Sequence, residues 1–301
     1  MVTYNSAEVV AASLNALPAD VEVIVVDNAS ADHTRSVVLD NRPDTEWVQT
    51  GANLGFAPAV NIAAKRARGE LFLLLNPDAM IAERAINDVL AVFDKHPDVA
   101  VAAPIVVEAG GHLTTMAGGF EPTIWRMFTH SSGLSRLAKK IPLLRGHYLL
   151  QGQQKREGLT DLDWVSGGCL FVRRSAWTEL GGLTERWFMY AEDVEFCLRI
   201  RDQGHRVVLA PWAEAEHAVG GSSSGTSAVR TQWLENLFDL YQMRYRAGFI
   251  RSWIWRFVVA GGYAARALVL RVTFSARGDR AAHQRFASYA RAIVSSKRRG
   301  E

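Results

Sequence analysis

The chain has 301 residues, 49% of them hydrophobic, which is enough for one large α/β domain or for one domain with an appendage. Its two cysteines, Cys169 and Cys197, lack the spacing of a metal site, and this favours a reduced cytoplasmic protein over a disulfide-rich secreted one. The net charge of +3 is unevenly distributed: residues 244–301 carry 13 Lys/Arg and 2 acidic residues, whereas residues 1–243 carry 21 and 29. The composition therefore predicts a mildly acidic domain followed by a basic appendage.

Strand and helix signals alternate in the first half of the chain. Residues 1–5 (MVTYN) are typical of the end of a buried strand that is expected to begin upstream, and no targeting segment is expected before it. Short apolar runs are typical of strands buried on both faces, and Asp32 is a candidate N-cap. The expected elements are strands over 23–26, 71–75 and 99–103, and helices over 32–41 and 83–96.

Strands separated by helices of this length predict an α/β fold with a mostly parallel central sheet flanked by helices. Ligands of such sheets bind at the carboxyl ends of the strands, where Asp27 and Asp78 are expected to lie.

The second half is less regular. Residues 107–162, rich in Gly, Pro and basic residues, are interpreted as a variable insertion near an acceptor site. Further on, a glycine turn within 164–173 leads into a strand. The remaining expectations are a helix over 192–203, a strand over 207–210, a flexible loop at 220–225 and helices to the end.

Several polar residues follow the predicted strands. The carboxylate of Asp27 could accept a hydrogen bond from a pyrimidine imide, although a turn or capping role is equally compatible with its position. Asn53 and Gly55 open a helix whose free N–H groups favour an anion, although an ordinary Asn/Gly turn is the more common meaning of such a motif.

A second group has the chemistry of a metal site. Asn76-Pro77-Asp78 delivers a carboxylate at a strand end, and a divalent cation on a diphosphate needs one or two such groups. A Pro-Asp turn is the structural alternative. A lone histidine is most often structural, yet His217 is a credible third ligand beside a carboxylate.

Glu192 and Asp193 begin a helix, where acidic residues also stabilise the helix dipole. A carboxylate that faces the cleft at this position could act as a general base on a sugar hydroxyl.

The succession of these motifs resembles the family 2 inverting glycosyltransferases of GT-A fold, and within them the rhamnosyltransferase-type enzymes of bacterial cell-wall linkers and O-antigens. The likeness extends over about residues 1–220. It rests on the following segments, in order: Val2-Thr3-Tyr4-Asn5, Val26-Asp27-Asn28-Ala29-Ser30, Asn53-Leu54-Gly55-Phe56-Ala57, Asn76-Pro77-Asp78, Ser166-Gly167-Gly168 and Glu192-Asp193.

The resemblance implies a role for each candidate residue. Asp27 would hold the nucleotide base, Thr3 and Asn5 would line its pocket, and Asn53, Gly55 and Asn76 would approach the ribose or diphosphate. Asp78 and His217 would bind Mn²⁺ or Mg²⁺. Asp193, beside Glu192, would be the catalytic base. The first acid of the family's Asp-x-Asp motif is Asn76 here, so fewer charges are expected to hold the metal.

The resemblance also implies a reaction. A sugar, L-rhamnose from dTDP-rhamnose or another dTDP- or UDP-sugar, would pass with inversion to a hydroxyl of a polyprenyl-diphosphate-linked glycan at the cytoplasmic face of the membrane. Two alternatives stay open: a sugar-nucleotidyl transferase, which should carry a Gly- and basic-rich loop that residues 2–6 lack, and a non-catalytic membrane-bound protein that binds sugar nucleotides, which should have lost its carboxylates.

The basic appendage, residues 221–301, begins with the predicted loop and continues with Trp and Arg interleaved. Its longest charge-free run, 257–265, has nine residues, whereas a membrane span needs about 20. We therefore expect helices that lie on an anionic membrane surface, with a packed helical pair as the alternative. Nucleic acid is not an expected partner, because the basic residues match no nucleic-acid-binding motif.

Overall fold

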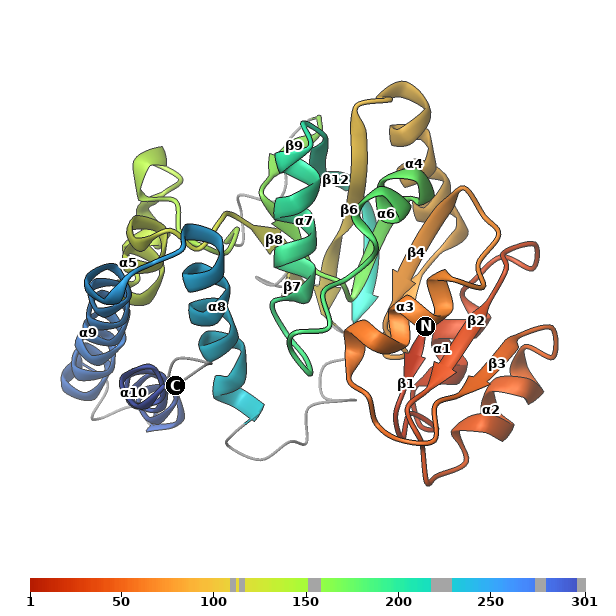
Figure 1. Cartoon of the computed structure of the whole chain (residues 1–301), viewed down its shortest axis with the longest axis horizontal. Coiled ribbons are helices and arrows are strands. Elements are labelled where there is room, and N and C mark those ends of the chain that lie inside the picture. The colour runs from red at the N-terminus through yellow and green to blue at the C-terminus, as the bar shows by residue number, and fades with distance from the viewer. Residues whose placement is uncertain (109–111, 114–116, 151–157, 218–228, 274–279, 297–301) are drawn as a thin grey trace. The chain divides into compact units, whose positions relative to one another are not determined.

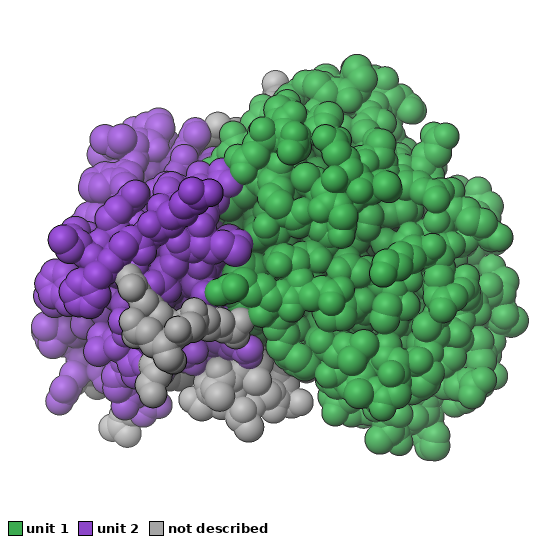
Figure 2. All heavy atoms as spheres, viewed as in Figure 1, with its two compact units in different colours: residues 1–118, 151–224 green, residues 119–150, 225–301 purple. Residues whose placement is uncertain are grey.

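The structure, a computed structural model, describes all residues except 109–111, 114–116, 151–157, 218–228, 274–279 and 297–301. The chain forms two compact units, coloured separately in Figure 2. Unit 1 comprises Met1–Gly118 and Gln151–Ser224, and unit 2 comprises Gly119–Leu150 and Gly225–Glu301. The predicted loop at 220–225 lies outside the described residues.

A three-stranded parallel sheet begins unit 1. It contains β1 (Val2–Thr3), β2 (Ile24–Asp27) and β3 (Glu46–Gln49), and its helices are α1 (Val10–Asn15), α2 (Thr34–Asn41) and α3 (Phe56–Ala64) (Figure 1). Side chains of β2 alternate between the two faces: Val25 packs in a cluster with α1 and α2, whereas Ile24 and Val26 pack with Ala59 of α3. The central strand is therefore buried on both sides, as its apolar run predicts.

The larger sheet of unit 1 has the order β4-β11-β6-β12-β5, with β7 and β9 paired at its margins. Its strands are β4 (Leu71–Leu75), β11 (Cys169–Arg173), β6 (Val99–Glu108), β12 (Arg206–His217), β5 (Ala79–Ile81), β7 (His112–Leu113) and β9 (Thr160–Leu162). The remaining elements of the unit are α4 (Glu83–Lys95), α6 (Arg174–Leu180), α7 (Glu192–Asp202) and β10 (Trp164–Val165), and the two residues of β8 (Gly118–Gly119) belong one to each unit.

The α/β architecture is confirmed, whereas the larger sheet is mixed and not mostly parallel as the sequence predicts. In the larger sheet β6 and β12 pair in parallel, whereas β4 and β11, β11 and β6, and β12 and β5 pair antiparallel. β12 runs seven residues beyond the predicted end at Ala210, because the exposed Glu214 and Glu216 alternate with the buried Ala213 and Ala215. Such alternation is typical of a strand with one exposed face.

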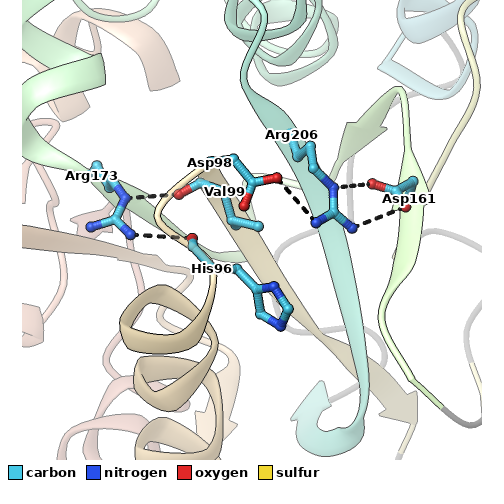
Figure 3. Close-up of polar contacts among 6 residues, drawn as sticks. All are labelled: His96, Asp98, Val99, Asp161, Arg173 and Arg206. Atoms are coloured by element: carbon cyan, nitrogen blue, oxygen red, sulfur yellow. Dashed lines mark hydrogen bonds and ion pairs between the residues drawn. The ribbon is translucent and has the colours of Figure 1, made fainter.

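Two arginines hold together the end of this sheet where β6 and β12 begin (Figure 3). Arg206 of β12 donates to Asp161 through Nε at 2.7 Å and through a terminal nitrogen at 3.1 Å, and it lies 3.3 Å from Asp98. Arg173 of β11 donates to the carbonyls of Val99 and His96. Arg206 pairs with two carboxylates and Arg173 caps backbone carbonyls at the opposite end of β12 from His217, so we regard both as structural contacts.

Unit 2 is helical. Its elements are α5 (Ile124–Ser132), the short 3₁₀ helices η1 (Leu134–Leu137) and η2 (Pro142–Leu144), α8 (Val229–Tyr245), α9 (Phe249–Thr273) and α10 (Arg280–Ser295). Its core contains Met127 of α5 with Phe238, Trp255 and Tyr263. Trp255 also donates through Nε1 to the carbonyl of Pro122 at 3.1 Å.

The prediction of an irregular insertion over 107–162 is wrong, because α5 belongs to unit 2 and packs on α9. A Cβ added to Gly262 of α9 would lie 2.1 Å from Oγ of Ser131, so the two helices cross closely. The sequence carries the signals of α5. Thr123 caps its start by accepting from the amide of Arg126, and Gly133 ends it with φ of +85°.

An apolar cavity of about 220 Å³ lies between the edge strands β1 and β4, next to α3. It is lined by Val2, Ile24, Val60, Phe72 and Leu74, among others. None of the polar candidate residues lines it, so this cavity is separate from the groups that are expected to bind a sugar nucleotide.

Candidate active site

The register of the small sheet sets Thr3, Asp27 and Gln49 side by side at the carboxyl ends of three strands. The buried carboxylate of Asp27 accepts from Oγ1 of Thr3 (2.8 Å), from Nε2 of Gln49 (2.9 Å), and from the amide and hydroxyl of Ser30 (2.8 and 2.5 Å). A carboxylate offers about four acceptor sites. Asp27 therefore organises this strand end, and a base N–H that binds it would take the place of one of these donors.

Asn5 holds the loop after β2 from the other side. Its backbone is left-handed, with φ of +51°. Its backbone N–H donates to Oγ of Ser30 at 2.8 Å, and its side-chain Oδ1 accepts from the backbone N–H of Ala31 at 2.8 Å. Thr3, Asn5 and Asp27 thus meet in one network. Gln49 and Ser30, which the sequence analysis did not single out, belong to the same network.

Gly55 lies where two loops touch. Its φ of +90° and ψ of −175° belong to a region that only glycine adopts readily, and a Cβ there would lie 2.2 Å from the carbonyl oxygen of Phe188. The same carbonyl accepts from the amide of Phe56 at 3.0 Å. Asn53 is exposed, and its Oδ1 accepts from the amide of Gly55 at 3.2 Å.

Asn61 of α3 fastens the loop that leads to α7. Its Nδ2 donates to the carbonyl of Leu183 and to Oε1 of Glu185, both at 2.9 Å, and its Oδ1 accepts from the amide of Leu183 at 3.0 Å. The segment between α6 and α7 is therefore held by the helix that Gly55 precedes.

Asn76 follows β4 and lies against the turn between β10 and β11. Its amide donates to the carbonyl of Gly168 at 2.9 Å, and a Cβ added to Gly168 would lie 3.3 Å from Nδ2 of Asn76. This turn thus keeps Asn76 at the strand end.

Asp78 and His217 meet across β5 and β12. Their antiparallel register pairs His217 with Ala79, the residue after Asp78, and Nε2 of His217 lies 3.3 Å from Oδ1 of Asp78. The Asp78 side chain is 1% exposed and that of His217 is 34% exposed.

One carboxylate oxygen and one imidazole nitrogen converge at this point, a donor set that suits Mn²⁺ or Mg²⁺ when substrate phosphates and waters supply the remaining ligands. Within the described part of the chain, no group of three or more His, Cys, Asp or Glu residues could hold a metal by itself. The two residues therefore fit a metal that is shared with a diphosphate.

Asp193 begins α7 and faces the glycine turn. Its Oδ2 accepts from the amide of Gly167 at 2.9 Å, and its Oδ1 accepts from the amide of Val194 at 2.8 Å. Burial raises the pKa of Asp193, and these two hydrogen bonds oppose the rise. Tyr190 and Ala191, just before it, have φ of +72° and +80°, a strained geometry of the kind that clusters at functional sites.

Glu192 is 4% exposed, and its Oε2 has no hydrogen-bond partner among the described residues. Burial and then the charge of Asp193 raise the pKa of Glu192. A carboxyl group in such surroundings favours its protonated form.

The structure joins most of the candidate residues through one set of loops. Gly167 and Gly168, adjacent in the chain, contact Asp193 and Asn76 respectively. Nδ2 of Asn28, next to Asp27, donates to the carbonyl of Gly55 at 2.9 Å. These contacts tie the loops that carry Asp27, Gly55, Asn76 and Asp193 to their neighbours, an arrangement that the sequence analysis did not specify.

Comparisons with known proteins show the family of the chain. Residues 1–176 match the family described as glycosyl transferase family 2. The N-acetylglucosaminyl-diphospho-decaprenol L-rhamnosyltransferase of Mycobacterium tuberculosis is 29% identical over 209 residues, which cover 65% of this chain and 66% of that enzyme, slightly less than two thirds. The rhamnosyltransferase WbbL of Escherichia coli is 36% identical over 217 residues, which cover 63% of this chain and 75% of that enzyme.

Among solved structures, the chain is similar to the mannosyltransferase PcManGT of Pyrobaculum calidifontis, in complex with GDP-mannose and Mn²⁺. The TM-score is 0.62 at 20% identity, over 98% of this chain and 86% of that one. This similarity confirms the GT-A fold that the succession of motifs implies.

Proposed function

The chain belongs to glycosyl transferase family 2, and we propose that it transfers a sugar from a nucleotide sugar to a hydroxyl of a lipid-linked glycan, with inversion at the anomeric carbon. The observation that carries the proposal is Asp193, a half-buried carboxylate at a strained helix start, held by the amides of Gly167 and Val194. Such a group is positioned to accept a proton.

In this reaction Asp193 takes the proton from the acceptor hydroxyl, whose oxygen attacks the anomeric carbon opposite the departing nucleotide. The two amide donors hold the carboxylate in one orientation, so little reorganisation is needed when the proton moves. Glu192, buried beside it and with a raised pKa, leaves the negative charge on Asp193.

Asp78 and His217 would hold Mn²⁺ or Mg²⁺ against the donor diphosphate. A divalent cation there neutralises charge that develops on the leaving group. Thr3, Asn5 and Asp27 would bound the base pocket, and Asn53, Gly55 and Asn76 would bound the ribose and diphosphate.

We propose L-rhamnose from a dTDP donor as the sugar, because two relatives are named rhamnosyltransferases. The name of the mycobacterial relative includes a decaprenol diphosphate glycan, which supports a polyprenyl-diphosphate-linked acceptor. A rhamnose donor and a polyprenyl-linked acceptor together indicate a role in the synthesis of a cell-envelope polysaccharide.

A lipid-linked acceptor requires contact with a membrane, and α9 offers a surface for it. The helix is buried on one side by Trp255, Val259 and Tyr263. Along another side it exposes a row of apolar side chains, here called the α9 ridge: Ile250, Trp253, Ile254, Phe257, Leu268, Val269 and Val272. By length and composition Phe249–Val272 could also cross a membrane, and 33% of its most apolar window is buried.

An exposed apolar row of this length on a basic helical unit fits an interfacial contact with anionic lipids. We propose that the ridge lies on the cytoplasmic face of the membrane as a peripheral contact. The buried half of α9 supports this over a spanning helix, because a spanning helix would have to leave the core of unit 2.

Incubating the protein with a panel of sugar nucleotides and Mn²⁺ tests the proposal. Release of nucleoside diphosphate from one of them, accelerated by a polyprenyl-linked glycan, supports transfer. Binding of a sugar nucleotide without turnover would favour the non-catalytic alternative, and formation of a sugar nucleotide from a sugar phosphate would favour a nucleotidyl transferase.

A further inference from the structure

Two arginines of unit 2 lie against one aromatic ring, and a third acts electrostatically on one of them. Arg266 of α9 and Arg285 of α10 place their guanidinium carbons 4.1 and 5.2 Å from the centre of the Phe286 ring. Burial, and then the positive charges of Arg136 in η1 and of Arg285, lower the pKa of Arg266. Three elements thus contribute three like charges, of which Arg266 is half-buried and Arg136 and Arg285 are exposed.

No carboxylate of the described residues compensates these charges. The ion pairs of unit 2 include Arg244 with Glu121, and none of the described pairs involves Arg136, Arg266 or Arg285. The nearby His130 is neutral at physiological pH, because burial, His147 and Arg266 lower its pKa to about 3.

The wider unit has the same imbalance. By sequence, unit 2 holds 19 Lys/Arg and 5 Asp/Glu, a balance of +14, whereas unit 1 holds 15 and 26. Like charges that share a partly desolvated site repel one another more strongly than they would in water. An anion bound between such charges would relieve this repulsion.

We propose that Arg136, Arg266 and Arg285 form a binding site for a phosphate-bearing anion of the membrane. Guanidinium groups recognise phosphate oxygens by paired, charge-assisted hydrogen bonds, and stacking on Phe286 restricts the motion of two of them. The phosphate belongs either to a phospholipid headgroup or to the diphosphate of a lipid carrier, and the second source rests on the function proposed above.

Vesicle binding by the full chain tests this site. The variants are Arg266→Gln and Arg285→Gln, with Arg271→Gln as the matched control, because Arg271 is an exposed arginine of α9 and removes the same charge. The vesicles contain phosphatidylcholine alone, phosphatidylcholine with phosphatidylglycerol, or phosphatidylcholine with polyprenyl diphosphate. Binding is measured at physiological salt, because this salt concentration screens isolated surface charges.

We expect Arg266→Gln and Arg285→Gln to bind the anionic vesicles about tenfold more weakly than the wild type, and Arg271→Gln to change binding less than about twofold. Weaker binding of these two variants to phosphatidylglycerol vesicles identifies a site for a lipid headgroup. Weaker binding only to vesicles with polyprenyl diphosphate identifies a site for the lipid carrier. Equal effects of all three variants in both kinds of anionic vesicle would overturn the proposal.

Two controls separate this outcome from others. Melting curves should show that Arg266→Gln is folded and no less stable than the wild type, because the substitution removes like-charge repulsion. If that variant unfolds, Arg285→Gln, whose side chain is exposed, carries the test. Transfer to a soluble acceptor should be unaffected by either variant, so failure of the sugar-transfer proposal would leave the vesicle result interpretable.

Discussion

Nε2 of His217 lies 3.3 Å from Oδ1 of Asp78, although α4, β6, β11 and α7 separate the two residues along the chain. The antiparallel pairing of β5 with β12 produces this contact by setting His217 opposite Ala79. A carboxylate and an imidazole that meet in this way are suited to share a divalent cation with the diphosphate of a donor.

The first prediction concerns this pair. Asp78→Asn removes the only formal charge of the two residues, and we expect a loss of activity on the order of 10³-fold, equivalent to several kcal/mol of charge stabilisation. His217→Ala should cost about tenfold. Direct titration with Mn²⁺, followed by its electron paramagnetic resonance signal, should show weaker binding to both variants. Full activity of the wild type in EDTA would contradict the metal assignment.

The second prediction concerns the stability effect of Glu192. Because burial raises its pKa above that of an unfolded glutamate, the folded protein binds this proton more tightly. Its contribution to stability is complete below the ordinary pKa of glutamate and is lost as the pH rises through the raised value. We expect Glu192→Gln to be more stable than the wild type by roughly 1 kcal/mol at slightly alkaline pH, and to show a weaker dependence on pH.

Urea unfolding at acidic and at slightly alkaline pH measures this difference. Glu195→Gln is the matched control on the same helix, because Glu195 accepts from Arg199 at 2.7 Å and its neutralisation should destabilise the protein. If Glu192→Gln raised the free energy of unfolding equally at acidic and at alkaline pH, burial of the charge would not be the cause.

The third prediction compares two glycines with positive φ. Gly55→Ala forces a Cβ against the carbonyl of Phe188, so we expect a loss of about 3 kcal/mol of stability together with most of the activity. Gly51→Ala meets no atom within 4 Å, and its φ of +76° should cost about 1 kcal/mol. Thermal unfolding and turnover measure both. Equal costs would mean that the contact with Phe188 does not hold this loop.

The fourth prediction concerns the α9 ridge. Changing Phe257 and Leu268 together to Asp should weaken binding to anionic vesicles on the order of 10²-fold, since each large apolar side chain contributes about 1.5 kcal/mol or more when buried. Leu143→Asp, at a leucine of unit 2 that is exposed but lies outside α9, is the control and should have little effect. If the double variant bound vesicles as tightly as the wild type, the α9 ridge would not contact lipid.

Much of this fold could be predicted from the sequence, because its strands are short apolar runs that end in polar residues. The turn at Asn76-Pro77-Asp78 and the helix start at Glu192 lie where the sequence places them. A search for continuous apolar runs misses the extension of β12 to His217, because residues 213–216 alternate between alanine and glutamate, the pattern of a strand with one exposed face.

The site shows the same division. Motifs identify the residues that carry charge, such as Asp27, Asp78 and Asp193. They do not identify the groups that hold these residues, such as Gln49 and Asn61, because those contacts form between segments that are distant in sequence. The packing of α5 in unit 2 is likewise a contact between segments distant in sequence, although Thr123 and Gly133 predict the helix itself.

The stereochemistry of transfer tests the central claim most directly. With the donor that the nucleotide-sugar panel identifies, nuclear magnetic resonance of the first product should show an anomeric configuration opposite to that of the donor. Asp193→Asn should bind this donor normally and lose turnover by about 10²–10⁴-fold, because the acceptor proton then has no base. Retention of configuration, or near wild-type turnover of Asp193→Asn, would contradict an inverting displacement with Asp193 as its base.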